Sequence, residues 1–432
     1  MEHGATLASA PVSRAESRLA ARAWLMVWMC MFGTMCCSTS VILVNVGVFM
    51  KPLAETFGWS RGAIALSLSI GAISMAAANP FVGRLIDRYG VRPVLITSLV
   101  GFGLATAAIP FLVGHFNIWG LYVGYAVVAG VGAGSNVIAY VRVLSGWFSG
   151  PMNHSRGMAL GVSSSGIPLG GAISGPIGVL LIERYGWQGG YWGLALLPLL
   201  VGLPIAIFAI RTAPHETEAK SAATETTAGQ LPGMTIGEAM RTRPFWILLG
   251  IVFLMSSCLQ GVGIHTAPLL SDFKLSPEKL ALVLALDGVL GIVGRIGAGY
   301  LFDRFFAPRV SMIIFGIAAI SALALAGFPG LIVAILATLL ITVGSGAESD
   351  LIGYLVGRYF GLKAYGQIFG TIYGMFMVGI ALGPYLFGLA FDTWGDYKIP
   401  FLMAGIGLGI ICGLLCLMPR FPQGGAFHTE QH

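Results

Sequence analysis

The sequence predicts an all-α membrane protein with twelve transmembrane helices in two homologous six-helix bundles. Three observations predict this fold: an apolar composition, long apolar stretches that recur along the chain, and a repeat that relates its two halves. Of the 432 residues, 56% are hydrophobic and 10% are charged. Soluble domains carry roughly 25% charged residues, so the chain is expected to reside in a lipid bilayer.

Long apolar stretches recur along almost the whole chain. A helix needs about 20 residues to cross a hydrocarbon layer of about 30 Å. Twelve stretches come close to or exceed that length: 24–49, 61–83, 92–113, 118–144, 157–182, 189–210, 245–270, 277–301, 310–328, 331–357, 366–391 and 399–418. The first stretch is too long for the apolar part of a cleaved signal peptide, so we expect the N-terminal segment to remain attached to the protein.

One long polar stretch separates the sixth span from the seventh. Residues 212–230 are rich in Ala, Thr and Glu, a composition typical of a linker. The expected organisation is a cytoplasmic tail at 1–23, a bundle at 24–211, a cytoplasmic linker at 212–243, a second bundle at 244–419 and a cytoplasmic tail at 420–432.

Lys and Arg are distributed unequally between the loops. With both termini in the cytoplasm, 16 of the 24 fall on the cytoplasmic side, 6 fall on the other side, and Arg142 and Arg295 lie within spans. Positive loops are retained in the cytoplasm, which predicts a multi-pass protein of the bacterial inner (plasma) membrane with both termini cytoplasmic. The asymmetry also accounts for the net charge of +6, so no nucleic-acid partner is expected.

The six cysteines all lie inside predicted spans, at spacings that match neither a zinc site nor a disulfide framework. We expect them to be core residues, and we expect no metal or cofactor.

Short motifs recur in the same order in the two halves. The pairs are Gly83–Arg88 with Gly299–Arg304, Gly132–Gly134 with Gly344–Gly346, and Gly175–Pro176 with Gly383–Pro384. Homologous bundles that rock about a site between them are typical of secondary transporters.

The loop after the second span resembles a known signature. Gly83, Asp87, Arg88, Gly90 and Arg92 resemble the loop between helices two and three of the major facilitator superfamily, with a degenerate copy at Gly299, Asp303, Arg304 and Arg309. The resemblance implies a transporter rather than an enzyme, and a gating role for these residues. Ion pairs between helices could form in one access state and break in the other. The alternative is that the charges only hold the loop on the cytoplasmic side.

Within that superfamily the chain resembles the bacterial monocarboxylate-transporter and oxalate/formate-antiporter branch. The motifs that carry the resemblance are Gly47–Phe49 with Phe57–Arg61, Trp147-Phe148 with Arg156–Gly161, His265–Pro268 with Asp272, and Arg358–Gly361 with Tyr365-Gly366. The resemblance implies a small organic anion as the solute, with an arginine of helix eight as its anchor.

Charged side chains are costly inside a bilayer, so each one within a span is a functional candidate. These are Arg142, Asp287, Arg295, Glu348 and Asp350. Arg295 is the residue that matches the implied anchor, and its planar guanidinium suits a carboxylate. The alternative is an arginine that braces the helix against a protein acid. Arg142, near a helix end, is expected to reach the interface and be structural.

Two acids are candidates for proton coupling, Asp287 and Glu348. Asp287 lies eight residues before Arg295, about 12 Å along a helix, which excludes a direct salt bridge. The resemblance to the mammalian monocarboxylate transporters implies an aspartate four residues before the arginine, where this chain has Gly291. Glu348 and Asp350 are about 200° apart on a helix, so only one is expected to face the cavity, and Asp350 could neutralise Arg358. Alternatively, Glu348 and Asp350 could both brace helix packing.

Uncharged or weakly basic groups could orient the solute. Asn45, Tyr140, His265 and Tyr373 are the candidates, although a lone histidine at a helix end is often structural. The span 366–391 contains no lysine, whereas the oxalate antiporters imply one there, which argues against a doubly charged solute.

Together these observations predict a monomeric secondary transporter that moves a monocarboxylate-like anion with a proton by alternating access. The alternative is an exporter or antiporter of another small solute, drug-like or a dicarboxylate. The arginine implied for drug antiporters is replaced by Ala126. An enzyme would need a catalytic cluster, and the sequence shows no nucleophile–base motif.

Overall fold

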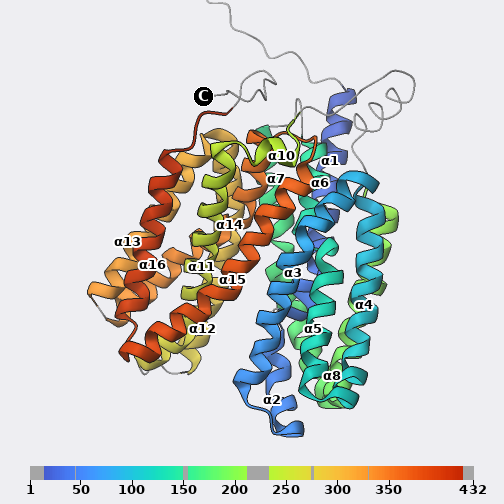
Figure 1. Ribbon diagram of the computed structural model, residues 1–432, viewed down its shortest axis with the longest axis vertical. Coiled ribbons are helices and arrows are strands. Elements are labelled where there is room, and N and C mark those ends of the chain that lie inside the picture. The colour runs from blue at the N-terminus through green and yellow to red at the C-terminus, as the bar shows by residue number, and fades with distance from the viewer. Residues whose placement is uncertain are drawn as a thin grey trace, which may run out of the picture.

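The computed structural model describes residues 14–43, 45–148, 154–211, 233–273, 277–328 and 330–421, and most of them are helical. Residues 1–13, 212–232 and 422–432, which belong to the predicted tails and linker, lie outside the described residues. The helices form two groups that lie side by side (Figure 1).

The first group contains the helices of residues 14–209. They are α1 (Arg14–Met35), α2 (Val46–Phe57), α3 (Arg61–Tyr89), α4 (Val91–Phe116), α5 (Ile118–Gly132), α6 (Val137–Trp147), α7 (Arg156–Ser164) and α8 (Gly166–Leu197). Short helical turns complete it: η1 (Thr39–Leu43), η2 (Ala133–Ser135), η4 (Pro198–Gly202) and η5 (Ile205–Ala209).

The second group follows the short helix α10 (Ile236–Ala239). It contains α11 (Arg243–Asp272), α12 (Pro277–Arg304), α13 (Ala307–Gly327), α14 (Leu331–Tyr359), α15 (Tyr365–Trp394) and α16 (Lys398–Cys416).

Ten helical segments of the described chain are long and apolar enough to cross a membrane. One of them, Arg156–Ala209, is 54 residues long. It holds two predicted spans, 157–182 and 189–210, which turn at Gly186, where φ is 73°. The first predicted span is broken after Met35 and leaves the shorter apolar helix Leu19–Met35. These two departures reconcile ten segments with twelve predicted crossings.

Asn45 stabilises the break in the first span. Its Nδ2 donates to the carbonyl oxygens of Ser40 and Val41, at 3.2 and 2.9 Å, and to Ser174 Oγ on α8, at 2.6 Å. Backbone groups that leave the regular helical pattern inside a membrane must find other partners. The amide supplies them, and it also ties the break to α8.

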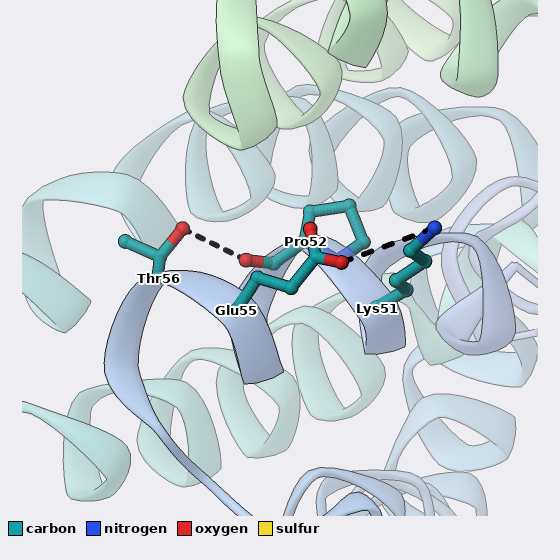
Figure 2. A network of polar contacts seen from close by, with 4 residues as sticks. All are labelled: Lys51, Pro52, Glu55 and Thr56. Atoms are coloured by element: carbon teal, nitrogen blue, oxygen red, sulfur yellow. Dashed lines mark hydrogen bonds and ion pairs between the residues drawn. The ribbon is translucent and has the colours of Figure 1, made fainter.

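The polar face of α2 lies at the end of the molecule away from α10 (Figures 1 and 2). Lys51 Nζ is 3.9 Å from Glu55 Oε1, and Thr56 Oγ1 donates to the Pro52 carbonyl at 2.8 Å. Both charged side chains are exposed, so their pair contributes at most about 1 kcal/mol. Exposed charges of this kind indicate that α2 ends at the membrane surface.

The short helix α10 is fixed at the opposite end. Thr235 and Glu238 form a capping box, in which Thr235 N donates to Glu238 Oε2 at 2.7 Å. The donated backbone N–H holds the pKa of Glu238 below its usual value. Met234 N donates to the Phe360 carbonyl at 2.8 Å, which fixes the segment before α10 to the loop between α14 and α15.

Glycines join the two groups of helices near α10. A Cβ on Gly83 of α3 would lie 2.0 Å from the Gly366 carbonyl oxygen of α15, and one on Gly299 of α12 would lie 2.3 Å from the Gly157 carbonyl oxygen of α7. Small residues allow such close backbone approach between membrane helices. From these contacts the groups diverge toward the end that carries α2 (Figure 1).

Candidate substrate site and gate

Arg295 lies on α12 where this helix meets both α7 and α14. Its Nη1 donates to the Ser164 carbonyl of α7 at 2.9 Å, while its buried Nε has no partner. A Cβ on Gly346 of α14 would lie 2.7 Å from Arg295 N, and one on Gly161 of α7 would lie 2.7 Å from Arg295 O. The glycines therefore place this guanidinium between the two groups of helices.

Glu348 and Asp350 of α14 are both buried, at 4% and 1% exposure, and both interact electrostatically with Arg295. Both acids are buried because α14 packs against α7, α11, α12, α13 and α15, which together cover opposite sides of the helix. That only one of the two faces the cavity stays a prediction. Asp350 does not pair with Arg358, which contacts the rings of Tyr354 and Phe421.

Each acid of α14 has one satisfied and one unsatisfied oxygen. Glu348 Oε1 accepts from Gln260 Nε2 of α11 at 3.0 Å, and Asp350 Oδ1 accepts from Ser349 Oγ at 3.4 Å. Glu348 Oε2 and Asp350 Oδ2 are buried without a partner. No ion pair joins Arg295 to either carboxylate among the described residues.

Asp287 lies apart from the charge cluster formed by Arg295, Glu348 and Asp350. Its Oδ1 accepts from Thr342 Oγ1 of α14, and the structure shows no contact between Asp287 and Arg295. The sequence excluded a direct salt bridge between them because of their separation along the helix. The contact with Thr342 joins α12 to α14 one to two turns from Glu348.

Tyr373 of α15 is the predicted polar residue that approaches the charge cluster. It is 4% exposed and interacts electrostatically with Arg295, Glu348 and Asp350. It belongs to a stack of aromatic rings on α15, with the Phe369 ring 5.3 Å and the Phe376 ring 5.0 Å from its own. The stack fixes the orientation of the Tyr373 phenol.

Tyr140 packs on the first group of helices. It is 1% exposed on α6, and a Cβ on Gly33 of α1 would lie 2.5 Å from its ring. This contact packs Tyr140 against the first span.

Asn45 and His265, also predicted to bind the solute, make structural contacts. The Asn45 amide is used at the break described above. His265 Nδ1 is 3.4 Å from Tyr397 Oη, and its Nε2 is 3.4 Å from the Pro384 carbonyl oxygen. The structure does not bring either residue to Arg295.

The signature aspartates each cap a helix of the other group. Asp87, at the end of α3, accepts from the backbone N–H groups of Gly366 and Gln367 at 2.9 and 2.8 Å, at the start of α15. Asp303, at the end of α12, accepts from those of Gly157 and Met158 at 2.6 and 2.8 Å, at the start of α7. A carboxylate is favoured at a helix N-terminus by the helix dipole and by the unpaired N–H groups.

The signature arginines form none of the expected ion pairs with the residues that the structure describes. Arg88 lies over the Tyr89 ring at 5.2 Å, Arg304 lies over the Tyr300 ring at 4.2 Å, and Arg92 Nη2 donates to the Ile207 carbonyl. Gly90 has a φ of 86°, a conformation that favours glycine. The charges thus act through helix caps and aromatic contacts.

Two arginines contribute to this end in a way that the sequence did not indicate. Arg156, assigned to a loop, is 4% exposed and donates from Nη2 to Ser145 Oγ at 2.8 Å and to the Gly353 carbonyl at 3.4 Å, across the two groups. Arg142, expected to be structural, interacts electrostatically with Asp87 and Tyr365. The Arg–Gly–Met motif at 156–158 carries the signal, since Asp303 caps its last two residues.

Comparisons with known proteins agree with this architecture. The model of the Major Facilitator Superfamily matches residues 24–372. The gentisate transporter of Corynebacterium glutamicum is 27% identical over 362 residues, which are 80% of this chain and 77% of that protein. The hexuronate transporter of Bacillus subtilis is 25% identical over 375 residues, which are 82% of this chain and 84% of that protein. Rat monocarboxylate transporter 4 is 23% identical over 394 residues, which are 87% of this chain and 79% of that protein.

Solved structures show the same fold. A fucose:proton symporter of E. coli, 16% identical, superposes with a TM-score of 0.65 over 93% of this chain and 99% of that one. With the family match, this confirms the predicted all-helical membrane fold.

Proposed function

This chain belongs to the Major Facilitator Superfamily, a family of transporters and not of enzymes, and we propose that its solute is a small organic anion of the monocarboxylate type, carried together with a proton by alternating access. The observation that carries the proposal is Arg295, a cation held between the two groups of helices with a buried nitrogen that has no partner. An ionised carboxylate is the ligand that such a donor binds best.

The names of similar proteins support an organic acid. Gentisate, hexuronate and gallate transporters, as well as monocarboxylate transporters, are 23–27% identical to this chain. These solutes differ in size and in ring content, and they share a carboxylate. The shared group is the one that Arg295 would bind.

The orientation follows from the loop charges. We propose that the end with α10 faces the cytoplasm of a bacterial cell, with both termini on that side and the monomer as the working unit. The Asp87 and Asp303 caps would then close the cytoplasmic side, so that the solute reaches Arg295 from outside. Opening requires both caps to be released, which is the gating role proposed for the signature residues.

Uptake by proteoliposomes tests the proposal. Labelled gentisate, glucuronate and lactate should be tested with an inward proton gradient, and at least one should enter saturably. Arg295→Lys keeps the charge but loses the planar fork, so we expect an increase in KM of at least about tenfold, equivalent to about 1.4 kcal/mol. Arg184→Lys, on an exposed residue of α8, is the matched control and should behave as wild type. Equal uptake by Arg295→Lys and wild type would remove Arg295 from the anchoring role.

A further inference from the structure

Arg156, the first residue of α7, is a buried cation without an acidic partner. It is 4% exposed, and among the described residues no ion pair joins it to a carboxylate. Its Nη2 donates to two uncharged acceptors, Ser145 Oγ at 2.8 Å and the Gly353 carbonyl at 3.4 Å. Its buried Nε has no hydrogen-bond partner among those residues. Buried charges in proteins are usually paired with an opposite charge, so this guanidinium is suited to an anion.

The partners of Arg156 belong to both groups of helices. Ser145 lies on α6, in the same group as Arg156. Gly353 lies on α14, and the Tyr365 ring, whose centroid is 5.9 Å from the guanidinium carbon of Arg156, lies on α15. Tyr365 Oη also donates to the Gly353 carbonyl, at 2.9 Å. When the two groups separate, this carbonyl therefore keeps a donor, whereas the guanidinium loses partners that it does not replace.

Arg156 and Arg295 lie near opposite ends of α7. Arg295 Nη1 donates at 2.9 Å to the carbonyl of Ser164, the last residue of this helix. Ser164 is eight residues from Arg156, which corresponds to about 12 Å along a helix. Each guanidinium has a buried Nε without a partner among the described residues. A carboxylate that leaves Arg295 along α7 toward the α10 end would therefore meet Arg156.

The face of α14 that packs against α7 carries glycines near Arg156. Gly353 and Gly357 lie three and seven residues after Asp350, on the same face of the helix. A Cβ on Gly353 would lie 3.6 Å from Leu160 Cδ1 of α7, and a Cβ on Gly357 would overlap the Arg156 guanidinium. Beyond Asp350, this face offers backbone to α7. Separation of α7 from α14 would thus open a passage that Arg156 borders and that these α14 positions do not block.

Resting on the proposed function, we propose that Arg156 is a second anion site, which binds the carboxylate of the solute on its way between Arg295 and the α10 end. Once α7 and α14 have separated, Nε and Nη2, on one edge of the guanidinium, can donate to the two carboxylate oxygens. The site forms in the conformation that is open at the α10 end. Solute affinity at that face therefore depends on Arg156, and affinity at the opposite face does not.

The experiment compares the two faces of the membrane. Right-side-out and everted vesicles from bacteria that express the full chain present opposite faces of the protein to the medium. The probe is labelled gentisate, glucuronate or lactate, whichever the wild type takes up. Arg156→Gln should raise the KM at the α10 face at least about tenfold, the loss expected for a charge-assisted hydrogen bond, and leave the KM at the opposite face unchanged. Arg156→Lys, which keeps the charge but not the planar fork, should raise the same KM by a smaller factor.

Two further variants serve as comparisons. Arg243, at the start of α11, is an exposed arginine at the same end of the molecule. Arg243→Gln removes the same charge as Arg156→Gln and should leave both KM values unchanged. Arg295→Lys should raise the KM at both faces, because the anchor is used in both conformations.

A second test leaves Arg156 in place. Leu160 lies one helical turn after Arg156 and faces Gly353 of α14. Leu160→Glu places a carboxylate within reach of the guanidinium, where it should compete with the solute and raise the KM at the α10 face. Leu160→Gln has the same length without the charge, so it should keep the wild-type KM.

The alternative role for Arg156 is a latch that only holds the α10 end closed. Loss of a latch favours the conformation that is open at this end, so the KM there would fall and the KM at the opposite face would rise. That result, or an unchanged KM at the α10 face in Arg156→Gln, would overturn the inference and leave the proposed function intact. If the wild type takes up none of the three acids from either face, the proposed function falls and the inference falls with it.

Discussion

The role of Asn45 that the sequence suggested differs from the role that the structure shows. The sequence suggested that it orients the solute, whereas the structure uses its amide to satisfy Ser40, Val41 and Ser174. Removal of a buried donor costs about 1–3 kcal/mol because its acceptors remain unsatisfied. Asn45→Ala should therefore lower the melting temperature of the purified protein while KM stays within about twofold of wild type.

Thr56→Ala is the control for that change. Thr56 also donates to a backbone carbonyl, at 2.8 Å, but on the exposed face of α2 (Figure 2), so its loss should leave the melting temperature nearly unchanged. If Asn45→Ala melts as wild type and instead raises KM, the residue contacts the solute as the sequence suggested.

Residue identities predicted part of the site. The rest could not be predicted, because it depends on which neighbouring helix each side chain faces. Arg295 could be found because a cation inside an apolar span is costly. The burial of both Glu348 and Asp350 could not be predicted, because a periodic pattern gives directions around one helix but not which helices enclose it. Arg156 was missed for a related reason: in sequence it is one more positive loop residue, and only the approach of α7 to α14 buries it.

At the scale of elements, backbone contact between helices sets the shape of the closed end. The close contact between α7 and α12 depends on glycine at 299, where a Cβ would lie 2.3 Å from the Gly157 carbonyl oxygen. Gly299→Ala must separate the two helices, and overpacking of this kind costs about 1–3 kcal/mol. We expect the closed conformation to lose that stability, which a fluorophore pair across the α10 end would report as a greater mean separation.

Gly297→Ala provides a control on the same helix. A Cβ on Gly297 meets nothing within 4 Å, so this variant should keep the wild-type separation between the fluorophores. An unchanged separation in Gly299→Ala as well would show that the glycine contact does not hold the halves together.

The order of elements could be predicted better than their continuity. The spans 61–83 and 366–391 correspond to continuous helices, α3 and α15, because apolar length decides both. The breaks at Met35, between Gly132 and Val137, and at Gly186 lie inside or between apolar runs, where hydropathy changes little. They depend on local polar partners, such as Asn136 Nδ2, which donates to Ser38 Oγ at 2.9 Å.

At the scale of the whole molecule, the two halves are joined by caps related by the internal repeat. Asp87 and Asp303 occupy equivalent positions of the repeated motif, and each binds the first backbone N–H groups of a helix in the other half. Each half therefore both donates and receives a cap. A rigid rocking motion would break both together, whereas a local movement would break one.

The double variant Asp87→Asn/Asp303→Asn separates these two possibilities. Each single change removes a charge from a helix N-terminus and one acceptor oxygen, a loss of about 0.5–2 kcal/mol, or roughly a twofold to thirtyfold shift toward the open conformation. If the halves move as rigid bodies, both caps oppose one opening step, and the free-energy changes should add to within about 0.5 kcal/mol. The measurement is the rate of maleimide labelling of a cysteine introduced at Ser145, which is fully buried beside Arg156, in a background without the native cysteines.

Asp396→Asn is the matched control for these variants. Asp396 also accepts from a backbone N–H, that of Lys398 at 3.0 Å, but within one half and on an exposed turn, so its loss should leave the labelling rate unchanged. A double variant that labels no faster than the quicker single variant would mean that one cap opens independently. In that case the second half would not need to move for the α10 end to open, and rigid rocking would be excluded for this protein.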